Sequence, residues 1–318
     1  MIRADPPKVT IGILCFNAEA TIARAVLSAV EQDYPNTEII VVDDRSSDGS
    51  LDILNEMARE NEIHLIKHSH NLGPGAARNS VIDSASGDFV AFFDDDDVAC
   101  PNRVSVQLNT ILEFEVILKT KKISCYASGK RHYPNGYTVD LPAIGSSGKT
   151  PPHGVKMAKS LLVYERESEW FYGAGTPTCA LMARLSFLQE IGGFDPKFRR
   201  VEDIDLAVRM ALAGAYFLGS RIHQFDQFAT DASDKSPMKN LEAEQYLVRK
   251  HQVFLEELGL YKYALRWPKL RYWHFTRNYF RFFVDLCRLL STNPMRTVRQ
   301  LFTTGPKRLI HEARMRRK

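Results

Sequence analysis

Residues 86–104 read SGDFVAFFDDDDVACPNRV and join a strand, an acidic turn and the start of a helix. After Asp88 the run is apolar up to Phe93, which is typical of a strand that is covered on both faces. Four aspartates, Asp94 to Asp97, follow it, whereas a helix cap needs only one. Hard divalent cations bind carboxylate oxygens, and Mg²⁺ commonly bridges carboxylates and phosphates. The segment therefore predicts a cation and phosphate site at a strand end.

Strands and helices alternate upstream of this segment. Apolar runs predict strands, and spacings of three and four predict helices. The predicted strands are 9–14, 38–42 and 63–67, and the predicted helices are 19–32, 50–60 and 76–85. This alternation predicts an α/β fold with a doubly wound, mostly parallel sheet. Ligands bind outside the carboxyl ends of such strands, so Asn17, Asp43, Asp44, Asn71 and the four aspartates are expected to converge there.

The pattern changes downstream of a predicted helix that runs to about Ile117. A hairpin is predicted over 126–140 with Asn135-Gly136 as its turn. A strand over 178–182, a helix over 186–191 and a helix from Val201 to Gly214 follow. From about residue 240 the chain is predicted to be helical to its end. We expect a body of residues 1–240, made of halves 1–117 and 118–240, and a helical extension of residues 241–318.

Composition excludes several classes. The 318 residues are 44% apolar and 25% charged, with a net charge of +4, which are ordinary globular values. Five scattered cysteines without a C-x-x-C pair argue against a disulfide framework and a zinc ribbon, and indicate a reducing compartment. No segment resembles a signal peptide or an uninterrupted membrane span.

The net charge conceals an asymmetry. Residues 262–318 contain 15 Lys and Arg but two Asp and Glu, whereas the rest of the chain contains 27 and 36. Basic side chains mixed with Trp267, Tyr272, Trp273 and Phe275 suit an anionic membrane surface. The alternatives are a helix packed on the body of the protein, or a partner protein. Nucleic acid is not expected, since no binding motif is present.

Three further motifs have two readings each. Arg78 in NLGPGAARN could pair with a diphosphate or be a solvated helical residue. The acids of Glu202-Asp203-Ile204-Asp205 could include a general base or simply favour a helix start. Asp43-Asp44 could accept hydrogen bonds from a nucleotide or be a phosphorylatable pair, as in receiver-type signalling modules.

Taken together, residues 8–230 resemble family 2 glycosyltransferases of the GT-A fold. The resemblance rests on five pieces in a fixed order: VTIGILCFNAEATIARAVLSAVEQDYP, EIIVVDDRSSDGS, NLGPGAARN, SGDFVAFFDDDDVACPNRV and IGGFDPKFRRVEDIDLAVRM. Each piece is modest alone, and their order and spacing make the resemblance specific.

The resemblance implies roles for individual residues. It implies Asp203 as the catalytic base and Asp96 as the ligand of a divalent cation, Mn²⁺ or Mg²⁺. The residues implied to bind the nucleotide-sugar are Phe16, Asn17, Glu19, Asp44, Arg78, Asp94 and Asp95. Within this set Asp44 is implied to contact the base, usually uracil, and Asp94 and Asp95 the ribose.

The implied reaction is inverting transfer of a sugar, expected to be UDP-linked, to a hydroxyl of a glycan or lipid-linked acceptor in surface polysaccharide or glycolipid synthesis. The implied location is the cytoplasm, peripheral on the inner face of the cell membrane, with residues 262–318 at the lipid surface. Two alternatives remain, a sugar-nucleotidyltransferase and a non-catalytic nucleotide-sugar-binding protein of the same fold. The sequence does not indicate an oligomeric state.

Overall fold

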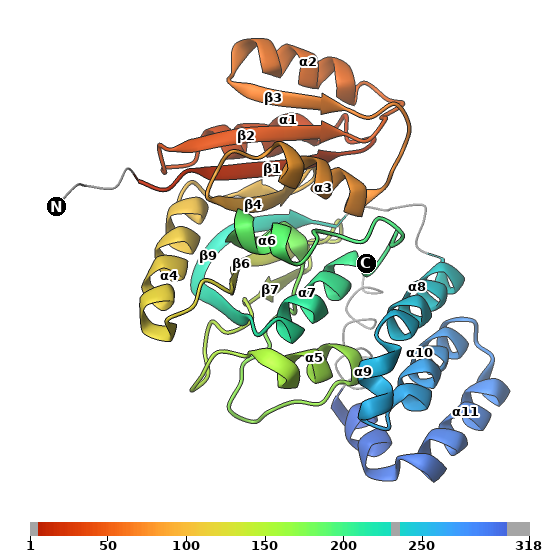
Figure 1. Cartoon of the computed structure of the whole chain (residues 1–318). Coiled ribbons are helices and arrows are strands. Elements are labelled where there is room, and N and C mark those ends of the chain that lie inside the picture. Colours follow the sequence, from red (N-terminus) through yellow and green to blue (C-terminus); the bar gives the residue numbers. More distant parts are fainter. Residues whose placement is uncertain (1–5, 230–235, 304–318) are drawn as a thin grey trace. The chain divides into compact units, whose positions relative to one another are not determined.

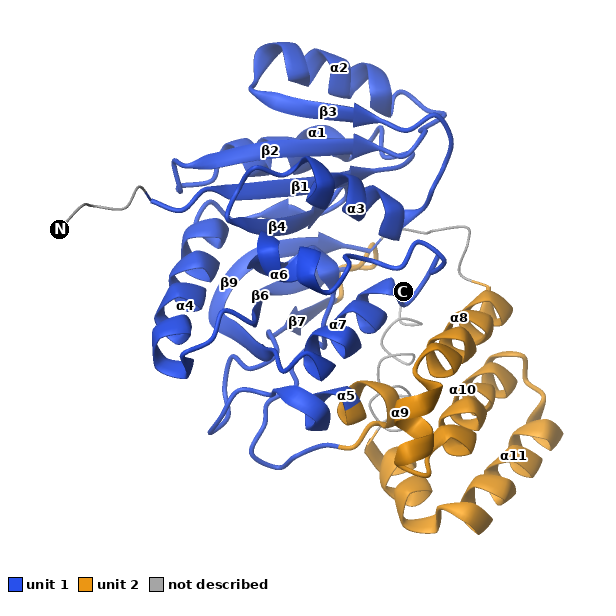
Figure 2. Cartoon of the chain, viewed as in Figure 1, with its two compact units in different colours: residues 1–132, 138–158, 166–230 blue, residues 133–137, 159–165, 231–318 orange. Residues whose placement is uncertain are grey.

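The computed structural model describes residues 6–229 and 236–303. Its contacts form two compact units, residues 1–132, 138–158 and 166–230, and residues 133–137, 159–165 and 231–318 (Figure 2). We call them unit 1 and unit 2 and describe each by itself. Within the described ranges, no helix combines the length and the apolar character that a membrane span requires.

Unit 1 is built around one mixed sheet (Figure 1). The strands are β1 (Val9–Cys15), β2 (Thr37–Asp43), β3 (Ile63–Lys67), β4 (Phe89–Asp94), β5 (Val98–Ala99), β6 (Ile123–His132), β7 (Thr138–Leu141), β8 (Leu181–Arg184) and β9 (Tyr216–Phe228). Their order is β3-β2-β1-β4-β8-β6-β9-β5, with β7 on β6. Pairing is parallel from β3 to β4 and between β6 and β9, and antiparallel at β8, β5 and β7.

The helices of unit 1 connect these strands. They are α1 (Ile22–Val30), α2 (Ser50–Glu60), α3 (Pro74–Ser84), α4 (Arg103–Leu118), α6 (Leu185–Glu190) and α7 (Glu202–Leu212); α5 (Gly154–Val163) begins in unit 1 and ends in unit 2. Right-handed crossovers from β1 to β2 and from β2 to β3 put α1 and α2 on one face, and the return to β4 puts α3 on the other. A Cβ on Gly12 of β1 would lie 2.4 Å from Val81 Cγ1 of α3, so this close packing requires glycine.

The doubly wound, mostly parallel α/β sheet predicted from the sequence is confirmed. The predicted hairpin is also present, with His132 opposite Thr138 and Gly136 at a φ of 77°. Two predictions were incomplete. Residues 178–180 form a 3₁₀ turn, so that the strand begins only at Leu181, and the 13-residue strand β9 was not predicted.

Unit 2 is mainly helical. It contains α8 (Pro237–Lys250), α9 (Gln252–Glu257), α10 (Tyr261–Phe275), α11 (Tyr279–Thr292) and a further helical stretch over 294–303. Its small core consists of Tyr263, Leu270 and Leu289, with Trp267 and Phe282 packed against it. Of the basic tail predicted to bind membrane, residues 304–318 lie outside the described residues.

Candidate active site

The acidic turn after β4 carries more carboxylates than its surroundings neutralise. Asp95 Oδ2 accepts a hydrogen bond from Phe16 N at 3.0 Å. Burial raises the pKa of Asp95 to about 7, and the neighbouring charges of Asp94 and Asp96 add to the shift. Two adjacent ionised carboxylates disfavour each other most strongly where water is excluded. The turn is therefore an electrostatically strained anionic site that a cation would relieve.

Asp97 is the most enclosed acid of the turn. Its Oδ2 accepts a long hydrogen bond of 3.4 Å from Gln227 Nε2, while Oδ1 is buried without a hydrogen-bond partner among the described residues. Burial raises the pKa of Asp97, and the charges of Asp94 and Asp96 raise it further. An orphaned buried oxygen is an unusual feature that a bound ion would explain.

The donor set of the turn fits a divalent cation. The ligand atoms of Asp94, Asp97 and Cys179 all lie within 4.8 Å of one another. Carboxylate oxygens are the ligands that Mg²⁺ and Mn²⁺ prefer. The sequence-predicted ligand Asp96 is partly buried on the same turn but does not belong to this group, so its role stays a prediction.

Arg78 links the turn to α7. It is 6% exposed, and its guanidinium contacts Glu202 Oε1 at 2.7 Å and Asp94 Oδ1 at 3.4 Å. Burial opposes the charged form, but the carboxylates of Asp94 and Glu202 together raise the pKa of Arg78 above its usual value. The alternative of a solvated helical arginine is wrong, since the side chain is buried between two acids.

Asp203 occupies the first turn of α7, next to Glu202. The helix begins after Val201, whose φ of 56° turns the chain into it. Burial raises the pKa of Asp203 to about 6, and the adjacent charge of Glu202 contributes in the same direction. A carboxylate with this pKa is ionised at neutral pH and is a stronger base than an exposed aspartate. This combination is what a general base requires.

The two loops that follow β1 and β2 are joined by hydrogen bonds. Asn17, at a φ of 52°, accepts from Ser47 N at 2.8 Å, and Glu19 Oε2 accepts from Gly49 N at 3.1 Å. Phe16 is 48% exposed beside Asp95. All three predicted residues thus lie at the carboxyl edge of the sheet, and the side chains of Asn17 and Glu19 also hold the neighbouring loop.

Asp44 is buried and anchors the loop before α3. Its carboxylate accepts from Leu72 N at 2.8 Å and Gly73 N at 2.7 Å, and it contacts His68 Nδ1 at 2.7 Å. A carboxylate can accept about four hydrogen bonds, so some capacity for a ligand remains. The predicted contact of Asp44 with a nucleotide base stays a prediction, and its loop contacts are a feature that the sequence did not indicate.

Two residues that support the site, His68 and Arg103, were not predicted from the sequence. His68 contacts Asp44 from the end of β3. Arg103, 1% exposed at the start of α4, donates to Phe92 O at 2.8 Å and Cys179 O at 2.6 Å, and burial lowers its pKa to about 10. Its position six residues after the acidic run was the only available signal.

The predicted residues therefore come together at one edge of the sheet. Asp94, Arg78 and Glu202 form a continuous chain of ion pairs that ends beside Asp203, although Arg78 and Glu202 are 124 residues apart. The loops bearing Phe16, Asn17, Glu19 and Asp44 adjoin this chain through Asp95. This arrangement can hold an anionic ligand and its cation next to a carboxylate base.

Comparisons with known proteins point to one family. Residues 10–151 match the family model described as glycosyl transferase family 2. The chain is 34% identical over 113 residues to an uncharacterized glycosyltransferase of Haemophilus influenzae, covering 35% of this chain and 45% of the relative. It is 38% identical over 101 residues to the UDP-Glc:α-D-GlcNAc-diphosphoundecaprenol β-1,3-glucosyltransferase WfaP of Escherichia coli, covering 32% and 40%.

A solved structure shares the fold. The crystal structure of S. aureus TarS 1-349 in complex with UDP-GlcNAc matches with a TM-score of 0.59 and 21% identity, covering 85% of this chain and 74% of TarS 1-349. This likeness shows the fold and confirms the predicted GT-A class. The chain spans less than half the length of these two curated relatives.

Proposed function

We propose that the protein transfers a sugar from a nucleoside-diphosphate sugar to a hydroxyl of a glycan or lipid-linked acceptor, on the premise that residues 10–151 match the model of glycosyl transferase family 2. The observation that carries the proposal is the series of ion pairs from Asp94 through Arg78 to Glu202. Asp203, whose pKa is raised by burial, directly follows Glu202 in the sequence. This arrangement supports a base at Asp203 next to a site for a cation and an anionic leaving group.

The proposed donor is UDP-linked. WfaP is named for UDP-Glc, and TarS has a structure in complex with UDP-GlcNAc. In this chain the loops of Phe16, Asn17 and Glu19 and the carboxylate of Asp44 would bind the nucleoside. The proposed products are surface polysaccharide or glycolipid, in keeping with the diphosphoundecaprenol acceptor in the name of WfaP.

The proposed reaction is a direct displacement with inversion. The acceptor oxygen forms a bond to the anomeric carbon while its proton passes to Asp203. The bond from that carbon to the diphosphate oxygen breaks, and the electron pair leaves with the nucleoside diphosphate. Arg78 would face the developing charge on the diphosphate. A divalent cation on Asp96 and its neighbours would supply further charge neutralisation.

A donor panel tests this proposal. The full chain is incubated with Mn²⁺ and individual nucleotide-sugars, and both thermal stability and donor turnover are measured. A ligand present at a hundred times its Kd stabilises a protein by about 2.7 kcal/mol. We expect one UDP-sugar to raise the Tm and to be turned over, and D203N to keep the Tm rise without turnover.

The same panel, extended by nucleoside triphosphates with sugar phosphates, separates the alternatives. A non-catalytic binding protein would show the Tm rise without turnover in the unmodified chain. A sugar-nucleotidyltransferase would release pyrophosphate from a nucleoside triphosphate and a sugar phosphate. Either result would refute the proposed transferase.

We also propose that unit 2 docks on an anionic membrane surface. On α11, Phe280 and Phe283 are 80% and 60% exposed, and Cys287 continues the same face at helical spacing. Over 294–303, Met295 and Phe302 are 84% and 76% exposed. Large apolar side chains that gather on one exposed face mark an interaction site.

Charge indicates which surface would cover these side chains. Exposed arginines flank the apolar face of α11 on one side, Arg281 and Arg288, and Arg299 is exposed on the following helical stretch. An apolar stripe bordered by arginine is typical of helices that lie in a membrane interface, and each basic residue near an anionic surface contributes about 1 kcal/mol. The bilayer would have to be anionic for this surface to bind well.

The sequence had suggested a different arrangement of this tail. Trp267 packs in the core of unit 2, and Trp273 Nε1 donates to buried Asp285 at 2.9 Å. These two side chains therefore support the fold of unit 2, and the phenylalanines of α11 are the better candidates for contact with lipid.

Vesicle co-sedimentation tests the docking. The full chain should pellet with vesicles containing phosphatidylglycerol and far less with phosphatidylcholine alone. F280S/F283S should reduce pelleting about tenfold or more, and V116S, at a 78% exposed site in unit 1, is the matched control. Equal pelleting of the double variant and the control would refute the proposal.

A further inference from the structure

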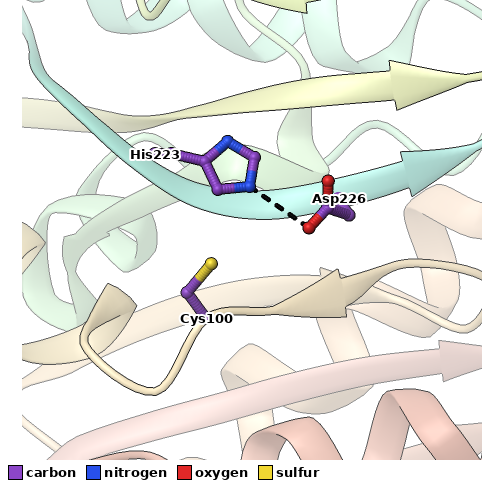
Figure 3. A group of neighbouring side chains, drawn as sticks. All are labelled: Cys100, His223 and Asp226. Carbon is purple, nitrogen blue, oxygen red and sulfur yellow. Dashed lines mark hydrogen bonds and ion pairs between the residues drawn. The ribbon is translucent and has the colours of Figure 1, made fainter. Parts of the chain in front are cut away.

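A second group of metal-ligating side chains lies outside the site described above. The ligand atoms of Cys100, His223 and Asp226 all fall within 4.8 Å of one another (Figure 3). None of the three belongs to the acidic turn or to the nucleotide loops. Asp226 is partly buried, as is Cys100, while His223 is exposed.

The backbone brings these residues together through β5 and β9. Val98 pairs with Asp226 and Ala99 with Phe225, and Cys100 N donates to Gln224 O at 2.8 Å. Alternation along a regular strand would put residues 223 and 226 on opposite faces. The register of β9 on β6 shifts between Ser128 and Gly129, where two steps on β9 match one on β6. A bulge of this kind re-aims side chains and lets His223 and Asp226 meet.

A fourth ligand is adjacent. His132, at the end of β6, contacts Asp226 Oδ1 through Nε2 at 2.6 Å, while His223 Nε2 contacts Oδ2 at 3.2 Å. The carboxylate therefore lies between two imidazoles from different strands. In metal sites such a second imidazole either joins the ligands or orients them.

The ligand types favour one class of metal. A thiolate, an imidazole and a carboxylate form a mixed set that suits Zn²⁺ better than Mg²⁺ or Mn²⁺, which prefer oxygen ligands. Tetrahedral zinc at bond lengths of about 2.0–2.3 Å brings its ligands to roughly 3.5 Å from one another. Closing the group to that size needs a shift of about 1 Å, which the exposed side chain of His223 can supply.

We propose that Cys100, His223 and Asp226, with His132 as a fourth or orienting ligand, form a zinc site that joins β5 to β9. The position gives the site a structural role near the catalytic edge. β5 directly follows the acidic turn, and Gln227 of β9 donates to Asp97. Zinc at this point would cross-link the two segments that hold Asp97, and it is distinct from the oxygen-ligated cation proposed for the turn.

Cobalt spectroscopy on the full chain tests the site. The chelator-treated protein is titrated with Co²⁺, and thiolate-to-cobalt charge-transfer absorption is recorded, followed by displacement with Zn²⁺. We expect one equivalent of the absorbing species, its loss on addition of Zn²⁺, and a higher Tm with Zn²⁺. C100S should abolish the absorption, and H132A should weaken binding about 10–100-fold.

Control variants locate the thiolate. C287S changes the exposed cysteine of unit 2 and should keep the absorption, as should D96A, which removes the proposed catalytic ligand. An absorption that survives C100S, or that disappears in C179S instead, would overturn the proposal. The Tm of C100S without metal should equal that of the unmodified chain, which excludes a folding defect. The cobalt absorption and the Tm do not depend on donor turnover, so this test can succeed or fail independently of the proposed transferase activity.

Discussion

At the scale of single residues, the two acids that open α7 have different environments. Glu202 Oε1 forms an ion pair with Arg78 Nη1 at 2.7 Å, so its charge is neutralised within the site. Asp203 has instead a pKa raised to about 6 by burial and by the neighbouring Glu202. A carboxylate with a raised pKa is suited to remove a proton, so we assign that role to Asp203 and expect Glu202 to act as a positioning residue.

The raised pKa of Asp203 predicts the acid limb of the pH profile. The base is active as the carboxylate, so kcat/KM should fall as the pH drops through about 6, with about a tenth of full activity at pH 5. D203N should lower kcat about 10²–10⁴-fold at every pH. The measurement is a profile of transfer rate from pH 5 to 8. A profile that stays flat down to pH 5 would contradict the assignment.

The charge of Glu202 should affect the pH at which activity falls on the acid side of the profile. In E202Q the like charge beside Asp203 is lost, so the pKa of Asp203 should fall and the acid limb should move to lower pH. A purely structural role for Glu202 would reduce activity without moving the limb. E190Q, at an exposed glutamate of α6 paired with Lys122, is the control and should leave the profile in place.

At the scale of elements, one carboxylate ties three segments at the amino-terminal edge of the sheet. Glu38 of β2 accepts from Lys8 Nζ at 2.8 Å, Ser86 N at 2.7 Å and Gly87 N at 3.0 Å. Burial alone would raise the pKa of Glu38, but these bonds, with Lys8 foremost, lower it to about 2. The carboxylate thus holds the starts of β1, β2 and β4 in register.

This carboxylate predicts a pH-dependent contribution to stability. Because the folded-state pKa is below the unfolded value of 4.5, the contribution is present above about pH 5 and is lost as the pH falls toward 2. E38Q should lower the free energy of unfolding by about 2 kcal/mol at pH 7 and by less than about half of that at pH 3. Urea unfolding at both pH values measures the difference. An equal loss at pH 3 and pH 7 would show that packing, not charge, is responsible.

At the scale of the whole molecule, the two units carry different chemistry. Unit 1 contains the acidic turn and Asp203, the proposed base, while unit 2 contains the exposed phenylalanines and arginines of α11. If unit 2 brings the enzyme to the lipid surface, membrane docking and sugar transfer can be measured separately by comparing a lipid-linked acceptor with a water-soluble one. Membrane docking raises the local concentration of a lipid-linked acceptor but does not affect one dissolved in water.

F280S/F283S should therefore discriminate between acceptors. With a lipid-linked acceptor in anionic vesicles, we expect transfer to fall about tenfold or more, following the loss of vesicle binding. With a water-soluble acceptor, the rate should equal that of the unmodified chain and of V116S. An equal loss of transfer rate with both acceptors would contradict the proposal, because it would show that the two phenylalanines stabilise the folded protein.

Local patterns were sufficient for much of the fold. The apolar run before Asp94, the strand–helix alternation over residues 9–94 and the Asn135-Gly136 turn each depend on neighbours in the chain, so the parallel sheet and the hairpin could be predicted. The position of the candidate site followed, because the carboxyl ends of parallel strands share an edge. Strand β9 was missed, since its polar residues Ser220, Arg221 and His223 break the apolar pattern.

Long-range pairing settled the rest, because charge and burial depend on residues that are distant in sequence. The sequence alone left Arg78 between a partner of a diphosphate and a solvated helical residue. Its burial against Glu202 excludes the solvated residue, while the contact with a diphosphate stays a prediction. It also left open whether the apolar side of α11 packs on the protein or faces a membrane. The tertiary structure turned Asp285 inward to Trp273 and left Phe280 and Phe283 in solvent. Helical spacing defines two faces, and only the neighbouring helices determine which one is buried.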